Sequence, residues 1–121
     1  MKKLLIVDDQ LLYLKSLELV LRKEYEVYLA QSYDEAINLL TNQDINLALI
    51  DVRLDEDNEE NIDGLRILEW IKMNKPNIIP FVMSAYQEFN YAEQALNLGA
   101  KHFFRKPIDV ESLKAILGEK S

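Results

Sequence analysis

The side chains that could do chemistry in this chain come directly after short apolar runs. The run at 47–50, Leu-Ala-Leu-Ile, leads into Asp51, and the run at 4–7, Leu-Leu-Ile-Val, leads into Asp8 and Asp9. Uninterrupted apolar runs of this length are typical of strands buried on both faces of a parallel sheet. The carboxylates therefore follow predicted core strands.

Two further apolar runs end in the same way. The run at 79–83 leads into Ser84, and the aromatic pair at 103–104 is followed by Arg105 and Lys106. The carboxyl ends of parallel strands share one edge of the sheet, where α/β folds bind ligands. We therefore expect three carboxylates, a hydroxyl and an amine to converge at that edge.

This set of groups has the residue types that phosphoryl chemistry needs. A carboxylate can attack phosphorus and form an aspartyl phosphate. Because a carboxylate and a phosphoryl group repel each other, a divalent cation has to bridge them. Mg²⁺ suits this task, since it takes one or two carboxylates together with phosphate oxygens and water.

Each residue also has a purely structural interpretation. An aspartate at a strand end, such as Asp51, is often only a turn or cap residue, and Asp8 could cap the following helix. Ser84 could be a turn hydroxyl, Phe103 a core residue and Lys106 a solvated loop lysine. The functional interpretation depends on all of them occurring together and in this order.

Strand and helix patterns alternate along the whole chain. The apolar runs predict strands, and apolar residues three and four positions apart predict helices. The predicted strands lie at 2–7, 26–30, 47–51, 79–84 and 102–105. The predicted helices lie at 10–23, from Ser32 to about 42, from 63 or 64 to 74, from about Phe89 to 98, and at 109–117.

Cap residues support these boundaries. Ser32 and Glu35 form a capping-box pattern, Gly99 suits the position after a helix, and Gly118 is predicted to end the last helix. Five alternating strands and helices imply right-handed crossovers and a parallel sheet covered on both faces. The prediction is a doubly wound, three-layer α/β sandwich that forms one domain over residues 1–121.

Composition narrows the class of protein. A chain of 121 residues with 49% hydrophobic residues fits one folded domain, and the lack of cysteine excludes disulfides and cysteine-ligated zinc. The net charge of −7 argues against nucleic-acid binding by this domain. The apolar run at 4–7 is too short for a signal peptide or a membrane span, so a cytoplasmic protein is expected.

The ordered motifs resemble the response-regulator receiver domain of two-component phosphotransfer systems. The resemblance covers the whole chain. It rests on the pair at 8–9, Asp51, Ser84-Ala85, and the segment 99–107, Gly-Ala-Lys-His-Phe-Phe-Arg-Lys-Pro. It implies the flavodoxin-like (βα)5 fold of that family, with strand order 2-1-3-4-5.

The resemblance also implies a role for each residue. Asp51 would be the phosphoacceptor. Asp8 and Asp9 would hold Mg²⁺ together with Asp51 and the main-chain carbonyl of Arg53, with Asp9 the more direct ligand of the pair. Lys106 would pair with the phosphoryl oxygens and balance the charge that develops in the transition state.

A two-state switch is implied as well. Ser84 would donate its hydroxyl to a phosphoryl oxygen, and Phe103 would turn inward when Ser84 moves. Pro107 resembles the family's cis-peptide proline. Phosphorylation would then shift the populations of two states, and the face formed by helix 4, strand 5 and helix 5 would meet a partner or form a homodimer.

The leading hypothesis is a phosphoacceptor signalling switch rather than an enzyme. It would take its phosphoryl group from a sensor histidine kinase or a histidine phosphotransfer protein and act on a downstream effector domain or protein. One alternative is a phosphorylation-independent interaction module with the same fold. Another is an aspartyl-phosphate hydrolase, which usually carries an acid two positions after its nucleophile, where this chain has Arg53.

Two features depart from the family. His102 stands where members tend to carry an acidic residue. Twelve positions separate Asp51 from Asp63 without a proline, and the segment from Asp55 to Asn61 is an acidic insert whose role the sequence leaves open. The acidic residues of the insert are Asp55, Glu56, Asp57, Glu59 and Glu60.

Overall fold

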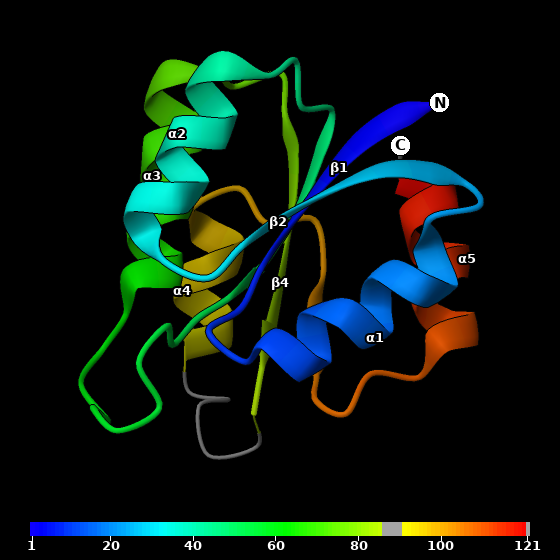
Figure 1. Ribbon diagram of the computed structural model, residues 1–121. Coiled ribbons are helices and arrows are strands. Elements are labelled where there is room, and N and C mark those ends of the chain that lie inside the picture. The colour runs from blue at the N-terminus through cyan, green and yellow to red at the C-terminus, as the bar shows by residue number, and fades with distance from the viewer. Residues whose placement is uncertain (86–90, 121) are drawn as a thin grey trace.

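A computed structural model describes residues 1–85 and 91–120 of the chain, which form a five-stranded parallel sheet with helices on both faces (Figure 1). The strands are β1 (Lys2–Val7), β2 (Tyr25–Ala30), β3 (Leu47–Asp51), β4 (Ile79–Ser84) and β5 (Phe103–Arg105). The helices are α1 (Leu11–Leu21), α2 (Tyr33–Asn42), α3 (Asp63–Asn74), α4 (Ala92–Asn97) and α5 (Val110–Lys120).

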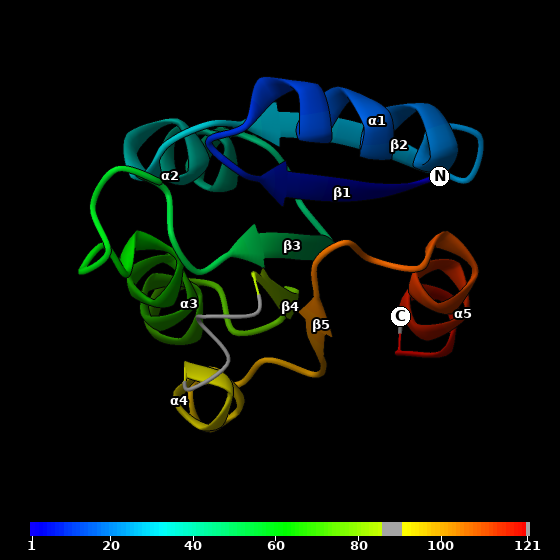
Figure 2. The same cartoon turned by 90° about the horizontal axis from the view of Figure 1, so that it is seen from below.

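The layers and the strand order confirm the predicted fold. The sheet runs β2-β1-β3-β4-β5, and every neighbouring pair is parallel. Figure 2 shows α1 and α5 on one side of the sheet and α2, α3 and α4 on the other. None of the helices in the described part of the chain has the length and apolar character needed to cross a lipid bilayer.

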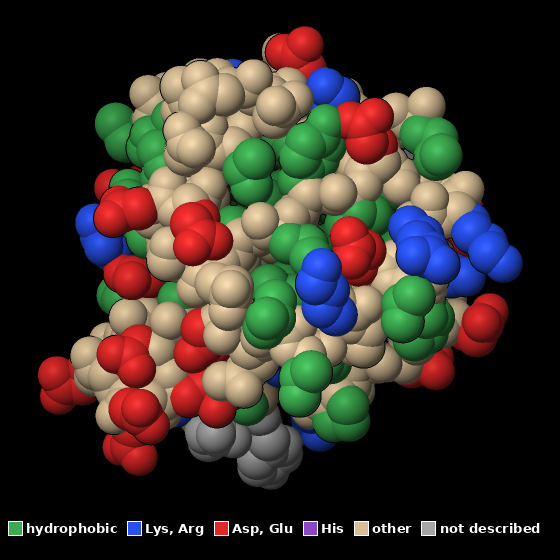
Figure 3. Space-filling model, viewed as in Figure 1, with side chains coloured by type: hydrophobic (Ala, Val, Ile, Leu, Met, Phe, Trp, Pro, Cys, Tyr) green, Lys and Arg blue, Asp and Glu red, His purple; other side chains and the backbone are tan. Residues whose placement is uncertain are grey.

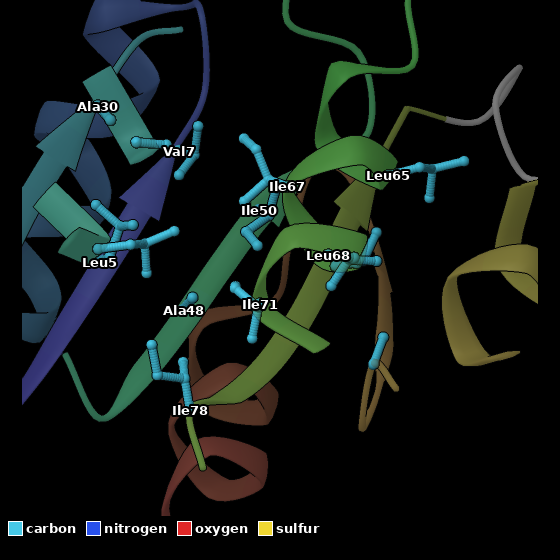
Figure 4. Close-up of a cluster of buried hydrophobic side chains, with 14 of the residues drawn as sticks. Leu5, Val7, Ala30, Ala48, Ile50, Leu65, Ile67, Leu68, Ile71 and Ile78 are labelled. Atoms are coloured by element: carbon cyan, nitrogen blue, oxygen red, sulfur yellow. The ribbon is translucent and has the colours of Figure 1, made fainter. Parts of the chain in front are cut away.

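The uninterrupted apolar runs are explained by burial on both faces. Successive side chains of a strand point to opposite faces, so Leu5 and Ala48 pack toward α2 and α3, whereas Leu4 and Leu47 pack toward α1 and α5. Figure 4 shows the first of these two clusters, between the sheet and α3. Each fully buried leucine or isoleucine contributes roughly 1.5–3 kcal/mol to folding.

The first turn of α2 confirms half of the predicted capping box. The Oγ atom of Ser32 accepts a hydrogen bond from the Glu35 main-chain N–H at 3.2 Å. The Glu35 carboxylate accepts from the N–H of Gln31 at 2.9 Å, one residue earlier than a capping box requires. The side chain therefore holds the residue before the cap, and the helix still begins where the pattern predicts.

The end of α4 confirms the prediction for Gly99, which has a positive φ of 100°. The Gly99 N–H donates to the Leu96 carbonyl and the Ala100 N–H donates to the Ala95 carbonyl, both at 3.1 Å. This pair of bonds is a Schellman motif, and Ala95 and Ala100 are buried together beneath it. The predicted start of this helix at Phe89 lies outside the described residues.

The prediction that Gly118 ends the last helix is wrong, because α5 continues to Lys120. Leu113 and Leu117 are fully buried and hold the last turns of α5 against the sheet. A glycine inside a helix costs about 1 kcal/mol relative to alanine, which packing of this size can offset. The bounds of β1, β3, β4 and α3 are as predicted. Others differ by one or two residues, as at α1, which spans Leu11–Leu21.

Gly64, in the first turn of α3, marks a close approach between this helix and the end of β3. Its N–H donates to the Val52 carbonyl at 2.9 Å. A Cβ atom on Gly64 would lie 1.9 Å from the carbonyl oxygen of Asp51 and 2.7 Å from the Cα atom of Val52. Only glycine therefore lets α3 begin this close to the strand that ends in Asp51.

We expect Gly64→Ala to lower the free energy of unfolding by about 3 kcal/mol or more, because the added methyl group meets main-chain atoms that cannot move aside. Gly118→Ala is the matched control. A Cβ atom there meets nothing within 4 Å, so this change should raise stability by up to about 1 kcal/mol through helix propensity. Urea unfolding of both variants measures the two effects. Equal stability of the two variants would contradict the close approach.

Candidate functional site

Three aspartates meet at the carboxyl edge of the sheet. Asp8 and Asp9 follow β1, Asp51 ends β3, and the two strands are direct neighbours in the sheet. One carboxylate oxygen from each of the three lies within 4.8 Å of the others. Asp8 is fully buried and Asp51 is 3% exposed. The predicted convergence of the carboxylates is confirmed.

Lys106, which follows β5, joins this group. Its Nζ atom lies 2.8 Å from Oδ2 of Asp51 and 2.6 Å from Oδ2 of Asp8. The peptide bond between Lys106 and Pro107 is cis, as the resemblance implies. One ammonium group thus bridges two buried carboxylates that come from different strands.

The pKa of Lys106 reports this environment. Burial works against its charged form, but the carboxylates of Asp51 and Asp8 outweigh that effect and raise the pKa of the ammonium above its ordinary value. Lys106 therefore stays charged over the whole physiological pH range. Buried charges of this kind are stable only when they are paired.

Asp9 is held differently. Its Oδ2 atom accepts a hydrogen bond from the main-chain N–H of Glu56 at 3.0 Å. Its Oδ1 atom is buried and has no hydrogen-bond partner among residues 1–85 and 91–120. Burial, with a smaller effect of the neighbouring Asp8 charge, raises the pKa of the Asp9 carboxyl above 3.8, its usual value.

Asp8 does not cap α1 in the way that its position suggests. The N-cap residue of α1 is Gln10, which makes no side-chain capping bond. Oδ1 of Asp8 instead accepts from the Gln10 N–H at 2.9 Å. This bond turns the chain from β1 into α1 and leaves Oδ2 of Asp8 directed at Lys106.

The two predicted switch residues lie on neighbouring strands. Ser84 ends β4, is fully buried, and donates its hydroxyl to the Ala85 carbonyl at 3.1 Å. Phe103 begins β5, is half-buried, and packs against the cluster under α2, α3 and α4. Their roles stay predictions, as does the role of the Arg53 carbonyl.

The acidic triad suits a divalent cation. Asp8, Asp9 and Asp51 supply only oxygen ligands, which hard cations such as Mg²⁺ prefer. The partnerless Oδ1 atom of Asp9 fits the same purpose, because a buried polar atom left without a partner is costly. The residues present therefore fit a divalent metal site.

The acidic insert forms an ordered loop between β3 and α3. The Asn58 N–H donates to the Asp55 carbonyl and the Asn61 N–H donates to the Asn58 carbonyl, both at 3.0 Å, so two turns follow each other. Figure 3 shows acidic side chains gathered over this loop. The loop approaches the site through the contact between Glu56 and Asp9.

Sequence reasoning missed two residues of this site. Tyr13 in α1 accepts a hydrogen bond from the Ile108 N–H at 3.3 Å, and the Nζ atom of Lys106 lies 4.9 Å from the centre of its ring. Tyr13 lies about one helical turn after the pair Asp8-Asp9, and this spacing is the signal in the sequence that could have indicated it. Glu56 contacts Asp9 through its main chain, so its side-chain type carried no signal.

The parallel α/β fold and the buried acidic pocket with its lysine together define a class of signalling domain. The family model described as the response regulator receiver domain matches residues 4–118. The chain belongs to this family.

Relatives and solved structures agree with this assignment. The chain is 36% identical over 115 residues to the transcriptional regulatory protein ZraR of Escherichia coli K12, with 94% of the chain and 25% of ZraR covered. It is 32% identical over 114 residues to the sporulation initiation phosphotransferase F of Bacillus subtilis, with 93% of the chain and 88% of the relative covered. The chain thus spans a quarter of the first relative and most of the second.

Two solved structures are similar over nearly the whole chain. The CheY-like receiver domain protein of Methanospirillum hungatei JF-1 gives a TM-score of 0.88 at 29% identity, with 99% of this chain and 93% of that chain covered. A second similar structure is that of a response regulator of Burkholderia pseudomallei, which holds a phosphorylated aspartic acid and a calcium ion. It gives a TM-score of 0.80 at 25% identity, with 100% of this chain and 74% of that chain covered.

We expect Asp9→Asn to raise the melting temperature in EDTA at pH 7 by a few degrees. The raised pKa of Asp9 means that its ionised form costs the folded protein stability. Asparagine carries no charge and keeps an oxygen for the Glu56 N–H. Added Mg²⁺ at fixed ionic strength should stabilise the parent protein more than this variant.

The same raised pKa sets the pH dependence. The parent protein recovers stability as the pH falls through the raised folded-state pKa toward the usual value of 3.8. The gap between the two melting temperatures should therefore be widest at pH 7 and close below that value. An Asp9→Asn protein that melts lower than the parent in EDTA at pH 7 would show that Asp9 acts mainly as a hydrogen-bond acceptor.

Proposed function

We propose that residues 1–121 form one receiver domain that acts as a phosphoacceptor switch, with Asp51 as the acceptor. One observation carries the proposal: the Asp51 carboxylate ends the central strand, is bonded to the Lys106 ammonium at 2.8 Å, and lies beside the carboxylates of Asp8 and Asp9. A similar structure with a phosphorylated aspartic acid supports it. So does the relative named as a phosphotransferase.

The reaction joins an Asp51 carboxylate oxygen to phosphorus. The donor is a phosphohistidine of a sensor histidine kinase or histidine phosphotransfer protein. The new P–O bond forms as the P–N bond breaks, and the electron pair of that bond leaves with the imidazole. Lys106 already lies against Asp51 and can donate to the phosphoryl oxygens as their charge develops.

A divalent cation would be held by Asp8, Asp9 and Asp51, with the main-chain carbonyl of Arg53 as a further ligand. Bound Mg²⁺ supplies the positive charge that lets an anionic phosphoryl group approach the carboxylates. Within this set, Asp9 contributes the Oδ1 atom that has no hydrogen-bond partner in the described chain. The domain would promote only its own phosphorylation and dephosphorylation.

Ser84 and Phe103 would transmit the change. The Ser84 hydroxyl now donates to Ala85, so it has to rotate before it can donate to a phosphoryl oxygen. Phe103 lies on the adjacent strand and is half-buried, which leaves it able to turn inward. The face made by α4, β5 and α5 would then bind a downstream effector domain or protein, or a second copy of the chain.

Treatment with Mg²⁺ and acetyl phosphate should add the mass of one phosphoryl group to the parent protein and none to Asp51→Asn. Intact-mass spectrometry after rapid quenching measures both. Asp55→Asn, in the exposed acidic loop, is the control and should be modified like the parent. Equal uptake by Asp51→Asn would refute the acceptor assignment, and no uptake by the parent would favour an interaction module that works without phosphorylation.

Phosphorylation or a beryllofluoride mimic should also shift amide resonances over the output face. We expect the shifts to include Tyr91, Lys101, His102 and Phe104, because the rings of His102 and Phe104 lie 4.6 Å apart and follow any movement of β5. A ¹⁵N correlation spectrum measures them. Shifts confined to the loops around Asp51 would show that the site is not coupled to this face.

A further inference from the structure

The acidic loop between β3 and α3 has a repeated construction. Its first turn spans Asp55–Asn58 and its second spans Asn58–Asn61, and in both the last N–H donates to the first carbonyl at 3.0 Å. In each turn the side chain of the first residue also accepts a hydrogen bond from the N–H two residues later. Asp55 accepts from Asp57 at 3.1 Å, and Asn58 accepts from Glu60 at 3.0 Å. These bonds lie within the loop and define its path.

The base of the loop is closed by one side chain. The Oδ1 atom of Asn61 accepts from the N–H groups of Leu54 and Asp63, both at 3.0 Å. Leu54 is buried, so this junction is attached to the core. Asn61 therefore joins the end of the loop to its beginning and holds the first turn over the carboxyl edge of the sheet.

The first turn reaches the candidate metal site through one main-chain group. The N–H of Glu56 donates to Oδ2 of Asp9 at 3.0 Å. The other oxygen of Asp9 is buried and has no hydrogen-bond partner within the described segments. Glu56 also lines a groove that leads to Lys106 between the loop and α1.

We infer that Glu56 is a positioning residue for the metal-binding carboxylate, acting through its main-chain N–H. By holding Oδ2 of Asp9, the acidic loop fixes the carboxylate in the orientation that leaves Oδ1 for the cation. The inference rests on the proposed function and deepens it, because it assigns a task to the acidic insert. A ligand held by such a partner binds its metal more tightly than a ligand that must first be ordered.

The charge of the loop is a separate property. The exposed carboxylates of the loop attract cations of any kind, and salt screens this attraction. The hydrogen bond from the Glu56 N–H, at 3.0 Å, instead fixes the orientation of the Asp9 carboxylate. The inference therefore predicts that binding depends on the N–H of Glu56 and not on its carboxylate.

The repeated turns supply a matched pair of variants. Glu56 and Glu59 occupy the same second position of the two turns, where proline is well tolerated. Glu56→Pro and Glu59→Pro each remove one carboxylate and one N–H. The N–H of Glu56 bonds to Asp9, whereas that of Glu59 makes no hydrogen bond to any residue that the structure describes.

We expect Mg²⁺ to bind Glu56→Pro about tenfold more weakly than the parent, and Glu59→Pro and Glu56→Ala nearly as tightly as the parent. Amide-shift titration with Mg²⁺ alone measures the affinity, and melting in EDTA checks that each variant is folded. Unchanged or tighter binding by Glu56→Pro, or equal weakening in Glu59→Pro or Glu56→Ala, would overturn the inference.

A second variant covers the case in which Glu56→Pro does not fold. Asn61→Ala keeps every main-chain N–H but opens the base of the loop, so it should also weaken Mg²⁺ binding, and unchanged binding would count against the inference. The parent protein separates the two claims. If it binds Mg²⁺ and takes up a phosphoryl group while the loop variants behave like it, this inference fails alone. If it does neither, the proposed function fails.

Discussion

The rest of the site depends on one ammonium group shared by two buried carboxylates. Nζ of Lys106 lies 2.6 Å from Asp8 and 2.8 Å from Asp51, and both aspartates are almost fully inaccessible to water. Removing one member of such a buried group costs about 3–5 kcal/mol, because it leaves a charge without a partner. The pairing therefore requires the carboxyl ends of β1, β3 and β5 to lie at the same edge of the sheet, so that Lys106 reaches both aspartates.

The same arrangement leaves the site short of positive charge. Lys106 supplies one positive charge to the two carboxylates of Asp8 and Asp51. Asp9 lies beside them with a raised pKa and one oxygen bonded to the acidic loop. A pocket of this kind is stabilised by a cation that binds the folded state and not the unfolded chain. The same excess of negative charge would therefore lower the stability of the metal-free fold and favour the binding of a cation.

The sequence predicts the features that depend on side-chain type and strand order. Runs of buried residues ending in Asp8, Asp51 and Lys106 are enough to predict a parallel sheet and the convergence of these groups, because parallel strands share a carboxyl edge. It could not predict contacts made by the main chain, such as the bond from Glu56 to Asp9. The path of α5 through Gly118 was also missed, since tertiary packing overrides helix propensity.

The close contact at Gly64 fixes one side of the end of β3. The first turn of α3 rests against the carbonyl of Asp51, with no room for even one methyl group. A displacement of the end of β3 toward α3 would compress main-chain atoms, so that direction is mechanically blocked. A displacement that starts at Asp51 would therefore have to leave α3 in place, and the first turn of α3 acts as a rigid support beside the end of β3.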